Sequence, residues 1–408
     1  MVLELLFNHV MARGTLTVID PGGAAARYGD GTAPAVTIRF HDRASQRRVV
    51  RNPQLGIPEA YMSGGLTIEN GSIYDFLDLV GANLAVTGPN WIMRARDRLA
   101  LMLRRLAQRN PIGRAQRNVA HHYDLSGEFY DLFLDSDRQY SCAYYDGPDD
   151  DLESAQEHKK RHIAAKLLVE PNHKVLDIGS GWGGLSLYLA AETGADVTGV
   201  TLSTEQHKVS QRRVAERGLD HKVRFHLRDY RQDTSIYDRI VSVGMFEHVG
   251  VGHYGEFFRK VRDSLAEDGV ALIHTIGRIE EPGTTNPFIR KYIFPGGYVP
   301  AMSEVVSSIE RTGLYVTDIE VLRLHYAETL RAWRTRFVAS WDRAKALYDE
   351  RFCRMWEYYL AASEVSFRHL GSVVFQFQLA RRQDAVPLTR DYVTDWERDR
   401  SHRKSVAA

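Results

Sequence analysis

A glycine-rich turn between an apolar strand and a helix is the part of this sequence with the clearest chemistry. Residues 175–185 read VLDIGSGWGGL, with Asp177 near the end of the apolar run and glycines at 179, 181, 183 and 184. Glycine allows the backbone to approach a flat bound molecule, because a Cβ atom would block that approach. The turn therefore predicts a cofactor site, and the glycines alone leave a dinucleotide and a methyl donor open.

The next predicted strand, residues 196–201, bears on that choice. It ends in Thr201-Leu202-Ser203. An enzyme that binds a dinucleotide usually has an Asp or Glu at this place, where it binds the ribose. This strand therefore does not support a dinucleotide site, and the choice between a dinucleotide and a methyl donor depends on motifs elsewhere in the chain.

Strands and helices alternate around this turn. We predict strands at 174–178, 196–201, 223–227, 238–243, 270–276, 315–322 and 373–377, separated by helices such as 204–217 and 254–265. Alternation of this kind predicts an α/β fold with a doubly wound, mostly parallel sheet, which binds its ligands at the carboxyl ends of the strands. Two segments interrupt it: a proline-rich stretch at 278–300, typical of a mobile lid, and a helical insert at 325–370.

Composition divides the chain into four parts. Residues 1–90 are predicted to form a small α+β domain for lipid docking or dimerisation, with strands at 15–19 and 35–40, a Gly/Pro-rich loop at 20–34 and a short helix at 74–80. An Arg-rich amphipathic helix and linker follow at 91–118. The catalytic domain is predicted at 119–385 and a C-terminal tail at 386–408.

The Arg-rich segment carries eight arginines and one acidic residue, Asp97, between positions 91 and 117. One interpretation is an interdomain helix with a solvated basic face. The other is a surface that meets anionic lipid headgroups, where each cation contributes about 1 kcal/mol. Nucleic acid is not expected as a partner, because exposed aromatic residues do not alternate with the arginines.

The overall composition is that of a globular protein: of 408 residues, 44% are hydrophobic and 26% charged, with a net charge of +1. Two cysteines are too few for a disulfide framework and favour a reduced cytoplasm. We expect no signal peptide and no membrane span, since the start is not basic and no apolar run reaches 18 residues. No metal site is expected either, because His121 and His122 are adjacent and do not share a helix face.

Further motifs, in a fixed order, resemble one family: the S-adenosylmethionine-dependent cyclopropane fatty acid synthases and their mycolic acid relatives. They are AHHYDL at 120–125, YSCAY at 140–144, GVTLS at 199–203, GMFEHVG at 244–250, HTIG at 274–277, KYIFPGG at 291–297 and HYAETL at 325–330. The resemblance spans about residues 55–380, and so many unrelated motifs in one order make it specific. It implies a Rossmann-like class I methyltransferase fold, and Thr201 is the residue expected there.

The resemblance also implies residue roles. The S-adenosylmethionine pocket would be lined by Val175, Asp177, Gly179, Gly181 and Gly183; the methionine end would be held by Tyr140 and Ser141; Thr201, Leu202 and Gln206 would face the ribose and adenine, flanked by Tyr230 and Arg231. A bicarbonate ion would be held by Cys142, Glu247, His274, Tyr326 and the backbone of Ile276. Taken one at a time, such residues are more often a solvated loop (Glu247-His248), an inert buried thiol (Cys142) or a core histidine (His274), and only their joint order in the family makes them site candidates.

The implied reaction explains such a set. Methyl transfer from a sulfonium to a cis double bond leaves a carbocation, and a base must then remove a proton so that the ring closes. Water must be excluded, and aromatic faces stabilise a cation; the candidates are Tyr123, Phe246, Tyr292 and Phe294. One departure concerns Ser363, which stands where many relatives carry a cysteine; the bicarbonate mechanism needs no thiol nucleophile there.

The resemblance implies a cytoplasmic enzyme that forms a homodimer, docks on the inner membrane leaflet and acts on cis-unsaturated phospholipid. Three alternatives stay open. The same cation can yield a methyl-branched or methylene chain, because the position of the base decides the product. The acceptor can be a small soluble amine or phenol. The chain can also be a non-catalytic lipid-binding or scaffolding protein that retains the fold.

Overall fold

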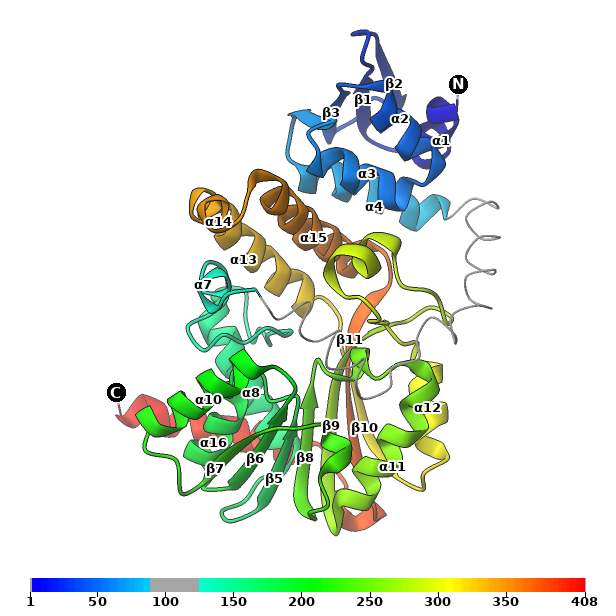
Figure 1. The fold of residues 1–408 in the computed structure, drawn as a ribbon. Helices are drawn as coiled ribbons and strands as arrows, with labels where there is room; N and C mark the ends of the chain where they lie inside the picture. The colour runs from blue at the N-terminus through cyan, green and yellow to red at the C-terminus, as the bar shows by residue number, and fades with distance from the viewer. Residues whose placement is uncertain (1, 89–124, 408) are drawn as a thin grey trace.

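A seven-stranded sheet forms the centre of the larger part of the molecule (Figure 1). The structure is a computed structural model and describes residues 2–88 and 125–407. The strand order is β10-β11-β9-β8-β5-β6-β7, and only β11 runs antiparallel to its neighbours in this sheet. The bounds are β5 (Lys174–Ile178), β6 (Asp196–Thr201), β7 (Val223–Leu227), β8 (Tyr237–Val243), β9 (Leu265–Arg278), β10 (Tyr315–Leu322) and β11 (Ser372–Ala380). The predicted α/β class with a mostly parallel sheet is confirmed.

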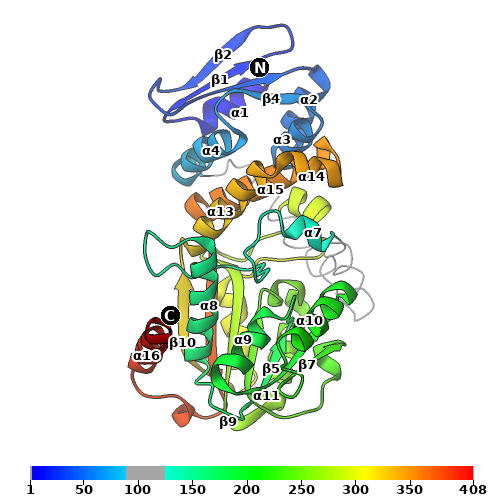
Figure 2. The same cartoon turned by 90° about the vertical axis from the view of Figure 1, so that its left-hand side faces the viewer.

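Helices cover both faces of this sheet, and most side chains of the central strands β5 and β8 are buried as a result. Val175 of β5 packs toward α8 (Leu152–Lys166), α9 (Gly184–Thr193) and α10 (Thr204–Glu216). The next residue, Leu176, faces the other way and packs toward α11 (Tyr254–Ser264) and α12 (Met302–Glu310). Two apolar layers therefore fix the sheet from opposite sides, and Figure 2 shows α8 and α9 in front of it.

The N-terminal residues form a separate small α+β unit with a sheet of order β2-β1-β3-β4. Its strands are β1 (Thr15–Ile19), β2 (Ala25–Gly29), β3 (Ala35–Phe40) and β4 (Leu66–Asn70), and its helices are α1 (Val2–Val10), α2 (Arg43–Arg51), α3 (Pro53–Met62) and α4 (Ile73–Thr87). The predicted loop at 20–34 is wrong in part, because it contains β2. This edge strand buries only Tyr28, so it lacks the alternation that marks a strand.

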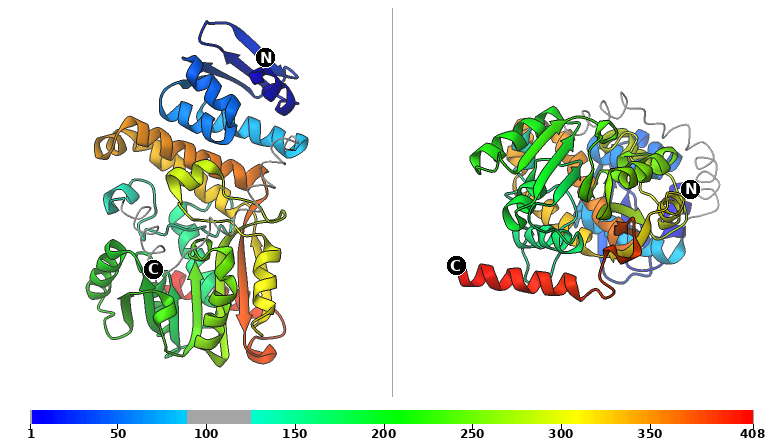
Figure 3. Two further views of the ribbon diagram at one scale, coloured as in Figure 1. Left: turned by 45° about the vertical axis from the view of Figure 1, so that its right-hand side comes forward. Right: turned by 90° about the horizontal axis from the view of Figure 1, so that it is seen from below.

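Three helices lie between the two sheets: α13 (His325–Ala339), α14 (Trp341–Leu347) and α15 (Glu350–His369) (Figure 3). They occupy the segment predicted as a helical insert. Helix α15 packs on α13 from one side and on α3 and α4 from the other. Polar contacts join it to the N-terminal unit, since the Tyr61 hydroxyl donates to Glu357 (2.6 Å) and His369 meets Asp78 (2.8 Å).

The C-terminal segment that the sequence predicts as a tail contains helix α16 (Asp391–Ala407). This helix lies along α8, where Glu397 contacts His162 at 2.8 Å and Trp396 packs against the core. Short elements complete the described chain: α7 (Gly127–Tyr130), η1 (Tyr230–Gln232), η2 (Phe246–His248), η3 (Val251–His253), η4 (Ile289–Ile293) and η5 (Gln383–Ala385).

Two sequence predictions fall outside the described residues, namely the Arg-rich helix at 91–118 and Tyr123. Among the helices within 2–88 and 125–407, none combines the length and apolarity needed to cross a bilayer.

Candidate active site

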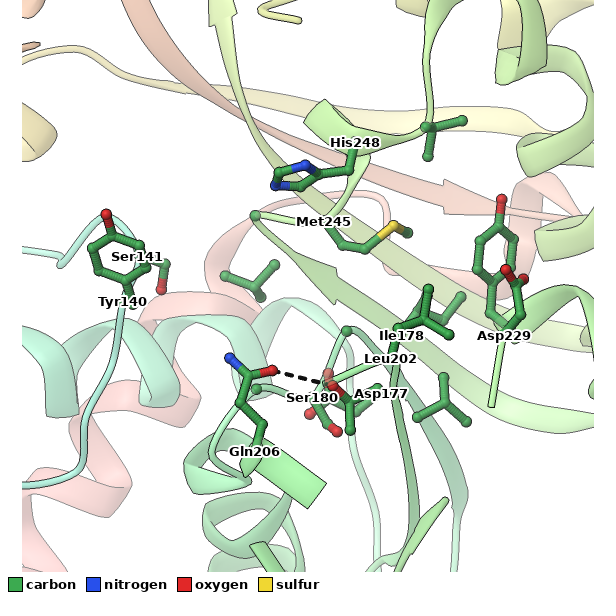
Figure 4. Close-up of a pocket in the computed structure, with 18 of the residues that line it drawn as sticks. Tyr140, Ser141, Asp177, Ile178, Ser180, Leu202, Gln206, Asp229, Met245 and His248 are labelled. Atoms are coloured by element: carbon green, nitrogen blue, oxygen red, sulfur yellow. Dashed lines mark hydrogen bonds between the residues drawn. The ribbon is translucent and has the colours of Figure 1, made fainter. Parts of the chain in front are cut away.

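A deep cavity opens at the carboxyl ends of β5, β6 and β8, where the fold predicts a ligand (Figure 4). Besides these strand ends, it is lined by residues 138–141, 228–231 and 295–296. Ten residues predicted to bind cofactor lie in its wall: Tyr140, Ser141, Asp177, Gly179, Gly181, Thr201, Leu202, Gln206, Tyr230 and Arg231.

The glycine-rich turn forms the floor of this cavity. Gly179 has a φ of +84°, and a Cβ atom there would lie 2.8 Å from the Cβ of Met245. Glycine is thus required both by the backbone conformation and by the close approach of Met245. Asp177 precedes the turn and accepts a hydrogen bond from Ser186 (2.7 Å), while burial raises its pKa to about 6.

Two predicted cofactor residues support the cavity from behind and are not among the described residues that line it. Val175 lies in the middle of the sheet, beside Val197 of β6. Gly183 is the N-cap residue of α9, and a Cβ atom there would lie 2.7 Å from the Phe225 ring. Both positions shape the turn through packing, and a direct contact with cofactor stays a prediction.

Polar groups suited to a nucleoside line the cavity from Gln206 across to Asp229 (Figure 4). Arg231 donates two hydrogen bonds to the buried Asp229 (2.8 and 2.7 Å), which fixes both side chains. The Thr201 hydroxyl donates to Gln206 (3.1 Å), as the dashed line in Figure 4 shows. These acceptors and donors can bind hydroxyl and amino groups, and the Tyr230 ring adds a flat apolar face.

The end of the cavity away from Asp229, where Tyr140 and Ser141 lie in Figure 4, has a buried cation behind its wall that the sequence did not reveal. Lys159 of α8 is fully buried, and its ammonium donates to the Ser141 hydroxyl (2.8 Å) and to Gln139 (2.6 Å). Burial lowers its pKa to about 8. Asp135 and Asp137 also interact with this charge, but the ammonium donates directly to Ser141, a lining residue, so a positive group lies next to this end of the cavity and suits a carboxylate.

Glu247 lies behind the cavity wall, between the lining residues Met245 and His248. Its side chain is 8% exposed, and Oε1 accepts a short hydrogen bond from the Ile276 amide (2.6 Å). Oε2 is buried and has no hydrogen-bond partner among the described residues. Burial raises the pKa of Glu247 to about 7, so this carboxyl group is suited to hold or exchange a proton near neutral pH.

His274 lies on β9, the strand that pairs with β8. Its carbonyl accepts a hydrogen bond from the amide of Gly244, the residue after β8 (2.9 Å). The ring is 2% exposed and contacts Gln376 at 3.2 Å through Nδ1. Burial, with the charges of Lys159 and Lys166, lowers its pKa to about 3. His274 is therefore a neutral imidazole across the physiological pH range.

Two of the remaining predicted ion ligands, Cys142 and Tyr326, lie on or next to α13. The Cys142 thiol is buried, and burial raises its pKa, so it stays protonated. The neighbouring Ala143 amide donates to Thr329 of α13 (3.0 Å). Tyr326 begins the same helix, with its ring against Phe367 (4.9 Å). The Ile276 amide, predicted to bind the ion, donates to Glu247 instead, and Ser363 is half-buried on α15.

The aromatic residues predicted to line a substrate pocket separate into different environments. Phe246 does not line the cavity; its ring stacks on Tyr254 (4.4 Å) in the core below the sheet, because it follows Met245 on the opposite side of the η2 turn. Phe294 lies next to the lining residues Pro295 and Gly296, with its ring 5.7 Å from His248. The Tyr292 hydroxyl donates to Glu59 of the N-terminal unit (2.9 Å).

Sequence reasoning missed Met245, His248 and Tyr359. Met245 and His248 line the cavity directly after β8, so the rule that ligands bind at carboxyl strand ends could have singled them out. Tyr359 shares a hydrogen bond with the Tyr140 hydroxyl (3.1 Å), and no pattern in α15 marks it. The site thus combines a cofactor cavity, a buried acid and an aromatic wall, which suits group transfer in a dry environment.

Comparison with known proteins decides the family. The sequence model of the mycolic acid cyclopropane synthetase family matches residues 112–377. The chain belongs to this family. Residues 3–85 match a second family, described as a domain of unknown function (DUF7884). The chain is an S-adenosylmethionine-dependent methyltransferase with the class I fold.

Relatives cover most of its length. It is 39% identical over 350 residues to the cyclopropane-fatty-acyl-phospholipid synthase of Escherichia coli (strain K12), covering 85% of this chain and 89% of that protein. It is 35% identical over 406 residues to the tuberculostearic acid methyltransferase UfaA1 of Mycobacterium tuberculosis, covering 93% and 91%.

A solved structure agrees with the catalytic part. The cyclopropane synthase MmaA2 from Mycobacterium tuberculosis superposes with a TM-score of 0.63 at 34% identity, covering 66% of this chain and 99% of that one. The mycolic acid cyclopropane synthase CmaA1, solved in complex with SAH and CTAB, gives a TM-score of 0.62 at 35% identity, with the same coverage.

Proposed function

We propose that this enzyme adds a methylene carbon from S-adenosylmethionine to the cis double bond of a phospholipid acyl chain, as a cyclopropane-fatty-acyl-phospholipid synthase. The observation that carries the proposal is the buried carboxyl of Glu247 beside the cofactor cavity, with one oxygen lacking a partner among the described residues. A buried acceptor of this kind calls for a ligand that donates a hydrogen bond. The long relative of the same stated activity supports the choice of acceptor.

The cavity fits S-adenosylmethionine in its shape and its polar groups. The bound cofactor supplies a methyl group made electrophilic by the sulfonium. Gly179 and Gly181 allow the backbone to lie against it, Asp229 and Gln206 bind the nucleoside hydroxyl and amino groups, and Lys159 with Ser141 suits the methionine carboxylate. Direct contacts from Val175 and Gly183 belong to the same proposal.

The residues behind the cavity fit a bicarbonate ion, which supplies the base that removes the proton before ring closure. Glu247 Oε2 would accept the hydroxyl of the ion, and the neutral His274 and the Tyr326 hydroxyl would donate to its other oxygens. The Cys142 thiol donates its one proton to the Ala143 carbonyl (3.3 Å), so it would have to rotate to donate to the ion. Ile276 takes part by holding Glu247 Oε1 in place, and Ser363 leaves the site without a thiol on α15.

Water is kept from the carbocation by the segment after β9, which carries η4 and the lining residues Pro295 and Gly296. The Lys291 ammonium and the Tyr292 hydroxyl of η4 both donate to Glu59 of α3 (2.7 and 2.9 Å). The N-terminal unit thus holds this segment in place. Phe294 and Tyr359, with ring centroids 6.1 Å apart, provide faces for a cation.

The proposal includes a peripheral place at the inner membrane surface and a homodimer. Residues 1–90 and the Arg-rich helix would meet the lipid headgroups, so that an acyl chain reaches the catalytic part without a membrane span. The same proposal includes the predicted domain boundaries: the Arg-rich helix and linker end at residue 118, the catalytic domain ends at 385 and the C-terminal tail begins at 386.

Release of S-adenosylhomocysteine by the purified protein tests this function. Vesicles of cis-unsaturated phospholipid are expected to stimulate release strongly, and vesicles of saturated phospholipid with the same headgroup are expected to do nothing. Equal release with both would exclude the double bond as acceptor and leave a soluble amine or phenol. Cofactor that fails to bind would favour a scaffolding protein.

One comparison favours a second product. The relative that covers 93% of this chain is named a tuberculostearic acid methyltransferase. The same carbocation can lose a chain proton and give an unsaturated methyl-branched chain, or undergo a 1,2-hydride shift and then lose a methyl proton to give a methylene chain; a saturated methyl branch would need a further reductant. A methyl donor carrying three deuterium atoms, combined with mild hydrogenation, separates the outcomes. A methyl branch formed by loss of a chain proton retains three deuterium atoms, whereas a cyclopropane ring and a methylene group each retain two, and of these two only the methylene group takes up hydrogen.

A further inference from the structure

Behind the proposed ion site, His274 faces a glutamine on the neighbouring strand. His274 of β9 and Gln376 of β11 are directly opposite each other in an antiparallel pair, so their side chains share one face of the sheet. Both are buried, with exposures of 2% and 0%. Their contact joins Gln376 Nε2 to His274 Nδ1 at 3.2 Å.

The direction of this hydrogen bond is fixed by a lysine on the other side of the glutamine. The Lys166 ammonium of α8 lies 3.1 Å from Gln376 Oε1. An ammonium group only donates, so the amide must turn its oxygen toward Lys166 and its NH₂ group toward His274. With the amide reversed, two donors would face each other inside the protein.

Lys166 is itself anchored by carboxylates. Its ammonium donates to Glu320 of β10 and lies 3.4 Å from Asp318. Burial disfavours the charge on Glu320, but hydrogen bonds from His162 and Lys166 outweigh it and hold the pKa of Glu320 at about 2. The carboxylate is therefore ionised at physiological pH and keeps Lys166 in place.

We infer that Gln376 is a positioning residue that fixes the neutral His274 as the tautomer with its proton on Nε2. Gln376 donates to Nδ1, and a nitrogen that accepts a hydrogen bond carries no proton. Because the ring is neutral, its one proton is on Nε2. The chain Glu320–Lys166–Gln376 thus leaves His274 with a donor at its remaining nitrogen.

The tautomer matters if the proposed function holds, on which this part of the inference rests. An anion beside His274 needs a donor, and the Nε2–H group supplies it. The opposite tautomer would present a lone pair to the ion and repel it. A neutral donor of this kind holds the ion without giving up its own proton, which leaves the ion free to act as the base.

Nitrogen NMR of the ring tests the inference in the ligand-free protein, because the two ring nitrogens of a neutral histidine differ clearly when only one carries a proton. The full chain is labelled with ¹⁵N-histidine, and the His274 signals are assigned by their loss in His274→Gln. At pH 7 we expect a protonated Nε2 and a bare Nδ1. A protonated Nδ1, in either the other tautomer or the imidazolium, would overturn the inference.

A charge-altering variant tests the role of the amide. In Gln376→Glu, one carboxylate oxygen keeps Lys166 while the other requires a donor, so Nδ1 is expected to become protonated. The matched control is Gln378→Glu, since Gln378 is equally buried two residues along β11 and donates to the Lys166 carbonyl (2.6 Å) rather than to His274. An unprotonated Nδ1 in Gln376→Glu, or a protonated Nδ1 in the control, would refute the assignment.

Turnover separates this inference from the proposed function. We expect Gln376→Glu to lower turnover by roughly tenfold or more, the effect of one charge-assisted hydrogen bond, while S-adenosylmethionine affinity changes little. If the wild-type spectrum shows the expected tautomer but no lipid is modified, the proposed function fails and the tautomer assignment stands. If lipid is modified and the tautomer differs, only the inference fails. The wild-type spectrum alone identifies the tautomer, even if Gln376→Glu does not fold.

Discussion

Replacement of Glu247 by glutamine is predicted to make the ligand-free protein more stable above pH 7 and to inactivate it. The carboxyl is buried, Oε1 accepts one backbone hydrogen bond, and Oε2 has no partner among the described residues. An ionised carboxylate in this position costs free energy unless a ligand is bound. Glutamine keeps the acceptor for Ile276 and removes the charge.

The size of the effect follows from the pKa. Burial raises the pKa of Glu247 from 4.5 to about 7 in the folded protein. The folded state therefore binds more protons than the unfolded state between these values, and the free energy of unfolding falls as the pH rises through this window. At about 1.36 kcal/mol per pH unit, the difference corresponds to roughly 3 kcal/mol. This contribution is present below pH 4.5 and is lost above pH 7.

Urea unfolding at pH 5 and pH 8 measures this pH-dependent contribution of Glu247 to the free energy of unfolding. Wild type is expected to lose most of those roughly 3 kcal/mol relative to Glu247→Gln between the two values. The control is Glu364→Gln, which removes a buried carboxylate that Arg334 and Arg368 hold at 3.0 Å each, and we expect it to destabilise by about 3–5 kcal/mol.

Turnover of Glu247→Gln should fall by roughly 100-fold, since the amide presents a donor where the ion needs an acceptor and a charged hydrogen bond contributes about 1.5–3 kcal/mol. Cofactor affinity should stay close to that of wild type. A variant that retains full turnover would refute the role of Glu247. A pH dependence of unfolding equal to that of wild type would refute its buried, unpartnered state.

Three further perturbations test other parts of the site. Lys159→Met should weaken S-adenosylmethionine binding by roughly tenfold or more in calorimetry, because a charge-assisted contact at the methionine end is lost; unchanged affinity would contradict this. Gly179→Ala should lower both the cofactor affinity and the stability of the protein, the stability by about 1–3 kcal/mol, since φ is +84° and the new methyl group meets Met245. An unaltered melting temperature would show that the turn accommodates the methyl group without strain. Glu59→Gln should weaken the contact with Lys291 and speed proteolysis of the 279–297 segment, while the surface control Glu69→Gln should not. Equal digestion of the two variants would contradict the claim that the N-terminal unit holds this segment in place.

The sheet could be predicted closely because its strands are short apolar runs between turns. The runs at 174–178, 196–201 and 223–227 coincide with β5, β6 and β7. Helices on both faces bury most side chains of β5 and β6, while the edge strand β7 leaves Arg224 exposed. The cofactor cavity followed from the same logic, since it lies where the strands end.

The polar network behind the site could not be predicted in this way. Gln376 and Gln378 alternate with Phe375 and Phe377, a pattern that places polar residues on a solvent-facing side. In the structure both glutamines are buried under α8, where Lys166 supplies the partner for Gln376. Such burial depends on a helix some two hundred positions earlier in the chain, and strand periodicity carries no sign of it.

Phe246 shows the converse. Its place in a motif next to Glu247 assigned it to the substrate pocket, but motif order does not fix the side to which a residue points. The η2 turn directs Glu247 Oε1 to Ile276 and the Phe246 ring into the core. Two neighbouring residues of one turn therefore differ in environment: Glu247 lies beside the candidate site, and Phe246 packs in the core.

The acyl product tests the proposed function most directly. Purified protein is incubated with S-adenosylmethionine and vesicles of cis-unsaturated phospholipid, and the released acyl chains are analysed by gas chromatography and mass spectrometry. We predict a chain heavier by one CH₂ unit whose ring survives mild hydrogenation. An unchanged acyl chain, with cofactor bound and vesicles intact, would contradict the proposed function.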